Sequence, residues 1–124
     1  MKPIPAYIAK WTDNFFHQSA YNQPVSFPNK YIINFLSRFK KTTSIQLYRG
    51  INKYNTENNL ITSWTYKKDI AARYTGNKGK LVKKVFSPRN ILLDTTTLNT
   101  KQKRQMGYDY KIDDKEVLIM NKIL

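Results

Sequence analysis

The residue types in this chain limit the chemistry that it can perform. Its 124 residues include no cysteine and a single histidine, His17, which excludes thiol nucleophiles and disulfides and leaves little basis for zinc binding or a histidine proton relay. We therefore expect a catalytic site to use carboxylate, hydroxyl, guanidinium or amine groups, with no metal. Such groups stand at the ends of apolar segments: Arg49, the hydroxyl pair Ser63 and Thr65, and Glu116.

The arginine ends a segment that alternates like a strand. In residues 44–51, Ile45, Leu47 and Arg49 fall on one side, and Gly50 follows at the exit. An arginine that shares a face with two aliphatic residues has two interpretations. Its guanidinium either snorkels to solvent at the strand end or binds an anion, because it makes planar, bidentate contacts to phosphate.

The hydroxyl pair lies where a strand gives way to a helix. Residues 60–64 are apolar and β-branched, and residues 66–74 have helical spacing, with Thr65 as the expected N-cap and Gly76 as the left-handed terminator. Strand alternation places Ser63 and Thr65 on the same face. Hydroxyls in such a position commonly only cap and turn the chain, so this segment alone favours a structural role.

The remaining patterns predict a single α+β domain over residues 1–124. Apolar residues at helical spacing indicate two packed helices in residues 1–43, at 5–16 and 31–39. Residues 44–124 are expected to be β-rich, and residues 95–111 are interpreted as a long polar stretch without a regular element. Further strands are predicted at 80–86, 91–94 and 116–120.

The net charge constrains the partner. The chain has 22 basic and 8 acidic residues, a net charge of +14, which attracts nucleic acid, acidic protein surfaces or phosphorylated small molecules. A biased amino-acid usage could also raise the lysine content without any binding role, and no established nucleic-acid-binding motif is present. No signal-like or membrane-spanning apolar run occurs, so we expect a cytoplasmic protein without a membrane partner. The oligomeric state is left open.

Three short motifs, taken together, resemble a known family. In order they are Leu47-Tyr-Arg-Gly50, Thr62-Ser-Trp-Thr65 and Asp114-Lys-Glu-Val-Leu118. This triple is similar to the Arg-Ser-Glu signature of the cholera-toxin-like ADP-ribosyltransferases, and the resemblance covers residues 45–120. It implies a split-sheet, NAD-binding core preceded by helices. It also implies mono-ADP-ribosyl transfer from NAD with release of nicotinamide, by a small phage-encoded or toxin-like enzyme in the host-cell cytoplasm.

The resemblance assigns roles to these residues. Cleavage of the nicotinamide–ribose bond passes through an oxocarbenium-like state, as glycoside cleavage does. Glu116 would stabilise that cation, Ser63 would hold Glu116 and the ribose, and Arg49 would bind an NAD phosphate. These three are the expected catalytic residues.

Further NAD contacts are implied around this triple. Thr65 would support the hydroxyl network, and the main chain of Gly50 would meet the nicotinamide amide. Tyr74 would stack on the nicotinamide ring, although its helical position fits a core-facing role equally well.

The acceptor is expected to meet the segment before Glu116. Four of the eight acidic residues lie in residues 109–116, which is either a charge-balancing turn or the family's acceptor-recognition loop. By the resemblance, Tyr108, Tyr110 and Asp114 would be acceptor contacts. The chain departs from the family pattern at Asp114, where relatives carry Glu or Gln. Alternation would place Asp114 and Glu116 on one face.

Three functions remain open at this point. The first is transfer of ADP-ribose to a protein side chain such as arginine, or to a nucleic-acid base. The second is a non-catalytic basic module that binds nucleic acid through charge and exposed aromatic rings. The third is NAD glycohydrolysis, in which water is the acceptor.

Overall fold

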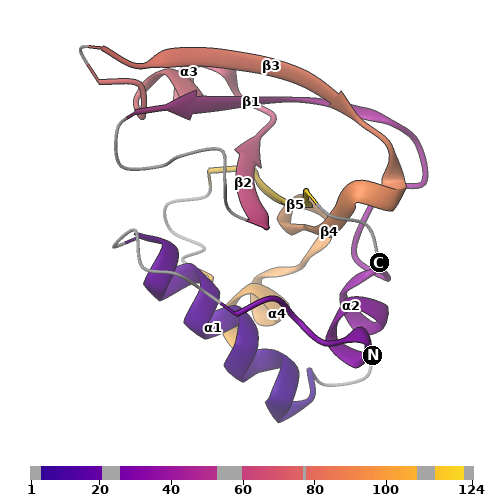
Figure 1. Cartoon of the computed structure of the whole chain (residues 1–124). Coiled ribbons are helices and arrows are strands. Elements are labelled where there is room, and N and C mark those ends of the chain that lie inside the picture. Colours follow the sequence, from indigo (N-terminus) through magenta and orange to yellow (C-terminus); the bar gives the residue numbers. More distant parts are fainter. Residues whose placement is uncertain (1–3, 21–25, 53–59, 77, 109–113, 122–124) are drawn as a thin grey trace.

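The computed structural model describes residues 4–20, 26–52, 60–76, 78–108 and 114–121. It has an α+β fold in which N-terminal helices precede a five-stranded antiparallel sheet of order β3-β1-β2-β5-β4 (Figure 1). The helices are α1 (Ala6–Ala20), α2 (Lys30–Leu36), α3 (Lys68–Ala72) and α4 (Thr100–Gln105), with 3-10 turns η1 (Pro88–Asn90) and η2 (Thr95–Thr97). The strands are β1 (Ile45–Ile51), β2 (Ile61–Thr65), β3 (Lys80–Phe86), β4 (Ile91–Asp94) and β5 (Glu116–Met120).

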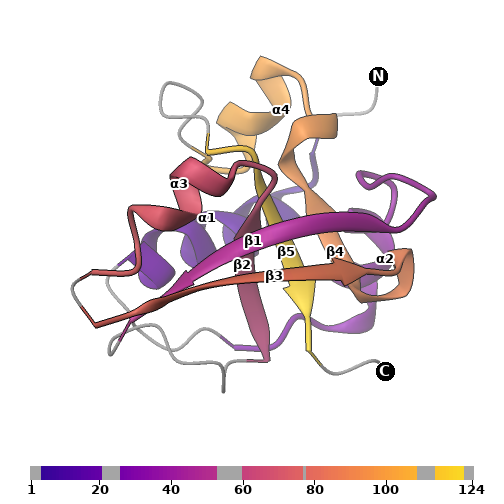
Figure 2. The ribbon, with the colours of Figure 1, turned by 90° about the horizontal axis from the view of Figure 1, so that it is seen from above.

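The sheet consists of two sets of strands joined at a single point. Strands β1 and β3 share seven register pairs and β2 and β5 share five, whereas β1 and β2 are joined only at Tyr48 and Thr65. We call β1 with β3 the ribbon, and β2, β5 and β4 the inner sheet. The ribbon runs across the inner sheet when the molecule is seen from above (Figure 2). The two sets therefore diverge on either side of one pair.

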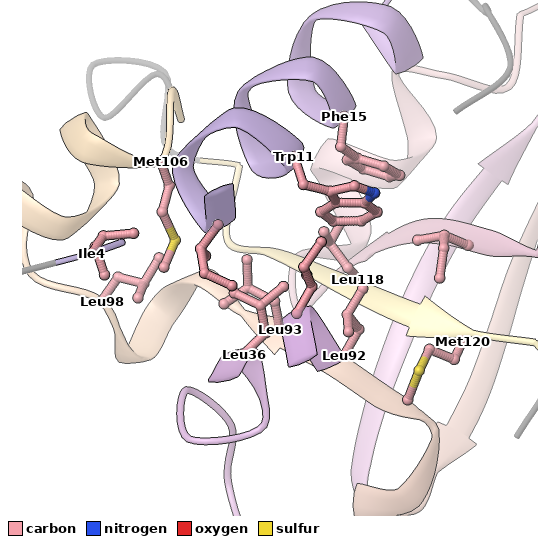
Figure 3. Packing of buried hydrophobic residues seen from close by; sticks show 13 residues of the cluster. Ile4, Trp11, Phe15, Leu36, Leu92, Leu93, Leu98, Met106, Leu118 and Met120 are labelled. Carbon is pink, nitrogen blue, oxygen red and sulfur yellow. The ribbon is translucent and has the colours of Figure 1, made fainter. Parts of the chain in front are cut away.

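Strand alternation in the inner sheet places successive side chains in two separate hydrophobic cores. Along β5, Val117 and Ile119 pack with Leu47 and Trp64 in a cluster between the ribbon and the inner sheet. Leu118, on the other face, packs in a second cluster between the inner sheet and the helices (Figure 3). Both faces of β5 are buried, which explains why its sequence is a continuous apolar run. The molecule thus has three layers: the ribbon, the inner sheet, and the helices α1, α2 and α4, whereas α3 lies beside the ribbon (Figure 1).

The N-terminal helices cover the face of the inner sheet that lies away from the ribbon (Figure 1). The helical spacing of their apolar residues predicts that they bury one face. In α1 the residues Ile8, Trp11 and Phe15 are buried, and the helix continues beyond residue 16, where the apolar spacing ends. In α2 the side chain of Asn29 caps the helix by accepting a hydrogen bond from the Ile32 amide at 3.0 Å. The predicted packing of two helices on one core is confirmed.

Two local predictions differ from the structure. Helix α3 begins at Lys68 with Lys67 as its N-cap, whereas Thr65 lies in β2 and accepts a hydrogen bond from the Lys67 amide at 3.0 Å. The prediction of Thr65 as the N-cap was therefore wrong. Thr65 pairs in the sheet, and the hydrogen bond to its hydroxyl stabilises the turn that precedes the helix. Gly76 does take the expected left-handed conformation, with φ of +64°.

The second difference is α4, in the stretch interpreted as irregular. Asn99 accepts a hydrogen bond from the Gln102 amide at 2.8 Å, and the Gln102 side chain accepts one from the Asn99 amide at 2.9 Å. This reciprocal capping box is readable as Asn followed by Gln three residues later. The helix escaped prediction because it is short and has little apolar periodicity, with Met106 entering the core just after its end.

Helix α3 packs directly on β1 at Gly50, which makes this glycine a test of the packing. A Cβ at position 50 would collide with the Ala71 carbonyl oxygen, a main-chain atom that cannot rotate away. We expect Gly50→Ala to lower the free energy of unfolding by about 1–3 kcal/mol, measured by chemical denaturation. Gly76→Asn is the control, since space there is open and asparagine tolerates the left-handed region. Equal stability of the two variants would contradict this close approach.

Candidate active site

Arg49, Ser63 and Glu116 meet in space, although the first and the last are 67 positions apart in the sequence. In the β2–β5 register Thr65 lies opposite Glu116, so Ser63 is its diagonal neighbour on the same face. The Ser63 hydroxyl donates a hydrogen bond to Glu116 Oε2 at 2.7 Å. Arg49 Nη1 donates to the Ser63 main-chain oxygen, also at 2.7 Å. One serine therefore links the arginine to the carboxylate.

The position of Arg49 follows from the junction of the two strand sets. The β1–β2 ladder has a single pair, at Tyr48 and Thr65, and Arg49 is the next residue along β1. Its guanidinium reaches across to the carbonyl of Ser63 in the neighbouring strand. Arg49 is buried, with 9% of its surface exposed, so the snorkelling interpretation was wrong. Whether it binds an anion stays a prediction.

Asp114 is anchored at three atoms. Its side-chain Oδ2 accepts a hydrogen bond from the Tyr74 hydroxyl at 3.0 Å, and its carbonyl accepts one from Thr65 Oγ1 at 2.6 Å. Its amide donates to the Tyr108 hydroxyl at 3.2 Å. The strand starts only at Glu116, and φ of +52° at Lys115 breaks the extended backbone. The prediction that strand alternation positions Asp114 beside Glu116 was therefore wrong. The three hydrogen bonds position Asp114 instead.

The tyrosines expected at the site lie in different surroundings. Tyr74 is 50% exposed, so its core-facing interpretation was wrong, and its hydroxyl points to Asp114. Tyr108 is buried, and its ring packs edge-on against Phe16 with centroids 5.0 Å apart. This places Tyr108 behind Asp114 as a support and not on the surface that an acceptor would touch. Tyr110 lies outside the described residues.

Sequence reasoning missed a set of hydroxyls that hold the start of β5. Thr95 Oγ1 donates a hydrogen bond to the Glu116 carbonyl at 2.6 Å. Thr95 is itself buried, next to Asp94, which accepts hydrogen bonds from the Tyr66 hydroxyl and from Thr96. The readable signal is an aspartate followed by three threonines, a pattern that favours a capped turn. These contacts fix the main chain of Glu116 from the side opposite to β2.

The surroundings of Glu116 raise its proton affinity. Burial raises the pKa of this carboxyl to about 7, and the neighbouring charge of Asp114 acts in the same direction. The Ser63 hydrogen bond and the Arg49 charge oppose this shift because both favour the ionised form. Glu116 is therefore poised to change protonation state near neutral pH.

This shift predicts a change of stability with pH. Because the pKa of Glu116 is raised from 4.5 to about 7 in the folded chain, the folded state retains a proton that the unfolded state has lost between these values. Stability contributed by the protonated form is thus complete below about pH 4.5 and is lost as pH rises through 7. The loss amounts to about 3 kcal/mol at most. Glu116→Gln should cancel it.

The measurement is the free energy of unfolding of both proteins from pH 4.5 to 8.5. We expect the difference between Glu116→Gln and the parent chain to grow in favour of the variant across the window, then to stay constant above it. Asp69→Asn, which removes an exposed carboxylate on α3, is the matched control. A difference that does not change with pH would contradict the raised pKa of Glu116.

An open groove of about 390 Å³ lies on the other face of β2. It is lined by Arg49, Thr62, Trp64, Val82, Lys84 and Asn121. Ser63 and Glu116 are not among the lining residues, because alternation turns them toward the helices. Arg49 is the one residue common to the groove and to the hydrogen-bonded triple.

Gly50 and Thr65 complete the residues expected to bind a cofactor. Gly50 is buried beneath α3, and Thr65 Oγ1 is engaged with Asp114 and with the Lys67 amide.

The part of the chain that the structure describes holds no cluster of three histidine, cysteine or acidic residues that could bind a metal, and no helix there is long and apolar enough to cross a bilayer. The chain matches no protein-family model, and no curated protein or solved structure shows significant similarity to it.

Proposed function

We propose that the chain is an NAD-dependent mono-ADP-ribosyltransferase with Arg49, Ser63 and Glu116 at its active site. The observation that carries this proposal is their convergence: Ser63 joins the buried guanidinium and the carboxylate through two hydrogen bonds of 2.7 Å. The resemblance rested on order and spacing alone, which do not require the three residues to touch. Their contact supports a common task.

The chemistry asks for these groups in this arrangement. Nicotinamide leaves with the electron pair of its bond to ribose C1, and the ribose acquires positive charge. The ionised carboxylate of Glu116 stabilises that charge, while the hydroxyl of Ser63 fixes its orientation before the reaction. The acceptor then bonds to C1 and loses a proton. Asp114, held two residues earlier, is placed to orient the acceptor or take that proton.

The remaining roles are those that the resemblance implies. Arg49 binds an NAD phosphate while it braces the junction between ribbon and inner sheet. The main chain of Gly50 meets the nicotinamide amide, and Thr65 supports the hydroxyl network. Tyr74, half exposed and tied to Asp114, contacts the nicotinamide or the acceptor. The single pair that joins the two strand sets supports the split-sheet, NAD-binding architecture of this class. Acceptor contacts by Tyr108 are indirect, through Asp114.

The acceptor belongs to a macromolecule with negative charge nearby. A net charge of +14 favours a nucleic-acid base, or a protein side chain such as arginine on an acidic or nucleic-acid-bound protein. The charge supports transfer to such an acceptor over hydrolysis, in which water alone would be the acceptor.

The experiment is incubation of the purified protein with adenylate-labelled NAD and whole-cell extract, followed by separate RNase, DNase and protease treatments. Label that depends on Glu116 and is lost after only one of the three treatments establishes transfer and names the acceptor. Glu116→Gln is the test variant and Asp69→Asn the matched control. Nicotinamide release without retained label would replace the proposal by NAD hydrolysis. No Glu116-dependent reaction would leave binding of nucleic acid as the function to examine.

A further inference from the structure

The groove above β2 is built from both strand sets. The ribbon contributes Arg49, Val82 and Lys84, which share a face because Arg49 pairs with Val82 and Leu47 pairs with Lys84. The inner sheet contributes Thr62 and Trp64, and Asn121 follows β5. The groove therefore lies in the angle where the ribbon leaves the inner sheet. Its volume, about 390 Å³, is within the range of small-ligand sites.

Three of the lining residues, Thr62, Trp64 and Asn121, are held in place by hydrogen bonds among themselves. Trp64 Nε1 donates to Thr62 Oγ1 at 2.9 Å, and Asn121 Nδ2 donates to the same oxygen at 3.2 Å. The Trp64 ring is fixed in turn against Phe86, edge to face with centroids 4.7 Å apart. These groups are pre-organised, so a ligand would find them already positioned.

The charge of the groove is positive. Among the described residues, its lining includes a guanidinium and an ammonium group but no carboxylate. The two strands of the ribbon hold four cations, Arg49, Lys80, Lys83 and Lys84, and no acidic residue. The buried arginine presents a planar guanidinium whose Nη1 already donates to the Ser63 carbonyl, and the exposed lysine offers a mobile point charge. This combination suits the oxygens of a phosphate group.

We propose that this groove binds a phosphate ester. Since Thr62 and Trp64 face away from Ser63, the phosphate would lie on the opposite side of β2 from the Ser63–Glu116 pair. Arg49 connects the two sides, because its Nη1 holds the Ser63 carbonyl while the side chain lines the groove. The phosphate belongs either to NAD or to a nucleic-acid strand. Both present the same phosphate oxygens to the groove.

Two adjacent lysines make the test specific. Lys84 lines the groove, whereas Lys83 is its exposed neighbour on the opposite face of β3. We expect Lys84→Gln to weaken binding of inorganic pyrophosphate about tenfold, the effect of one charge-assisted contact. Lys83→Gln removes the same charge from the same strand and should change the dissociation constant less than about twofold. Calorimetric titration of each folded protein gives these constants without any catalytic turnover.

Two further titrations identify the source of the phosphate. Pyrophosphate displaced by NAD in a Lys84-dependent manner assigns the groove to the dinucleotide, and displacement by a single-stranded oligonucleotide assigns it to nucleic acid. Equal losses in the two lysine variants would overturn the proposal, because attraction would then be diffuse. Absence of pyrophosphate binding to the parent chain would overturn it as well. Either failure leaves the Glu116-dependent labelling experiment unaffected, so the groove and the proposed transfer reaction are tested separately.

Discussion

Glu116→Gln is expected to lower turnover of NAD by about 100-fold or more while leaving NAD affinity nearly unchanged. The amide has the shape of the carboxylate and can still accept the hydrogen bond from Ser63, so the ground-state complex is preserved. It lacks the negative charge that the ribose cation requires. An interaction made only in the transition state changes kcat and not substrate binding. Nicotinamide release under saturating NAD, with calorimetric NAD binding, separates the two quantities.

Two comparisons make this result interpretable. Asp69→Asn removes a carboxylate on α3 without touching the triple and should turn over NAD like the parent chain. Circular dichroism and thermal unfolding establish that Glu116→Gln is folded. Equal turnover by Glu116→Gln and the parent protein would remove Glu116 from the mechanism and, with it, the proposed enzymatic function.

The activity should also fall steeply in acid. If Glu116 must be ionised, kcat/KM decreases about tenfold for each pH unit below its pKa of about 7, so that pH 5 gives about 100-fold less than the plateau. Binding of NAD brings a cationic nicotinamide ring to the carboxylate, which favours the ionised form. The acid limb of kcat should therefore lie at lower pH than the limb of kcat/KM.

Initial rates over pH 4.5–9 at low and at saturating NAD give both limbs. Asp114→Asn provides a second readout, because Asp114 raises the pKa of Glu116 by its charge. Its removal should shift the acid limb of kcat/KM to lower pH, since the ionised carboxylate is then less disfavoured. A limb that stays in place in this variant would show that a group other than Glu116 controls the profile.

The regular elements were predictable because their patterns agree with the environment that buries them. The alternation of apolar and polar residues predicted β1 and β3, and the apolar run of β5 predicted a strand that is buried on both faces. The start of α3 and the existence of α4 were not predicted. Their ends depend on competition for a few hydroxyl and amide groups, as Thr65 illustrates by serving the sheet and the turn before α3.

The candidate site was predictable as a set of residues but not as a geometry. The diagonal placement of Ser63 and Glu116 needs the β2–β5 register, which no short-range pattern specifies. The contact of Arg49 with the Ser63 carbonyl needs the ladder to end after one pair. Tyr74 and Asp114 meet across 40 positions, at the end of one short helix and before a left-handed residue. Such contacts form only in the folded chain, so no local sequence pattern predicts them.

The order of strands leaves β3 and β4 at the two outer edges of the sheet, where unpaired main-chain groups invite pairing with another copy. Strand β4 is short and has an irregular register against β5. Strand β3 is longer, and its exposed lysines are Lys80, Lys83 and Lys84. Two molecules aligned edge to edge along β3 would bring six ammonium groups together, so electrostatic repulsion protects this edge from fibril-like growth.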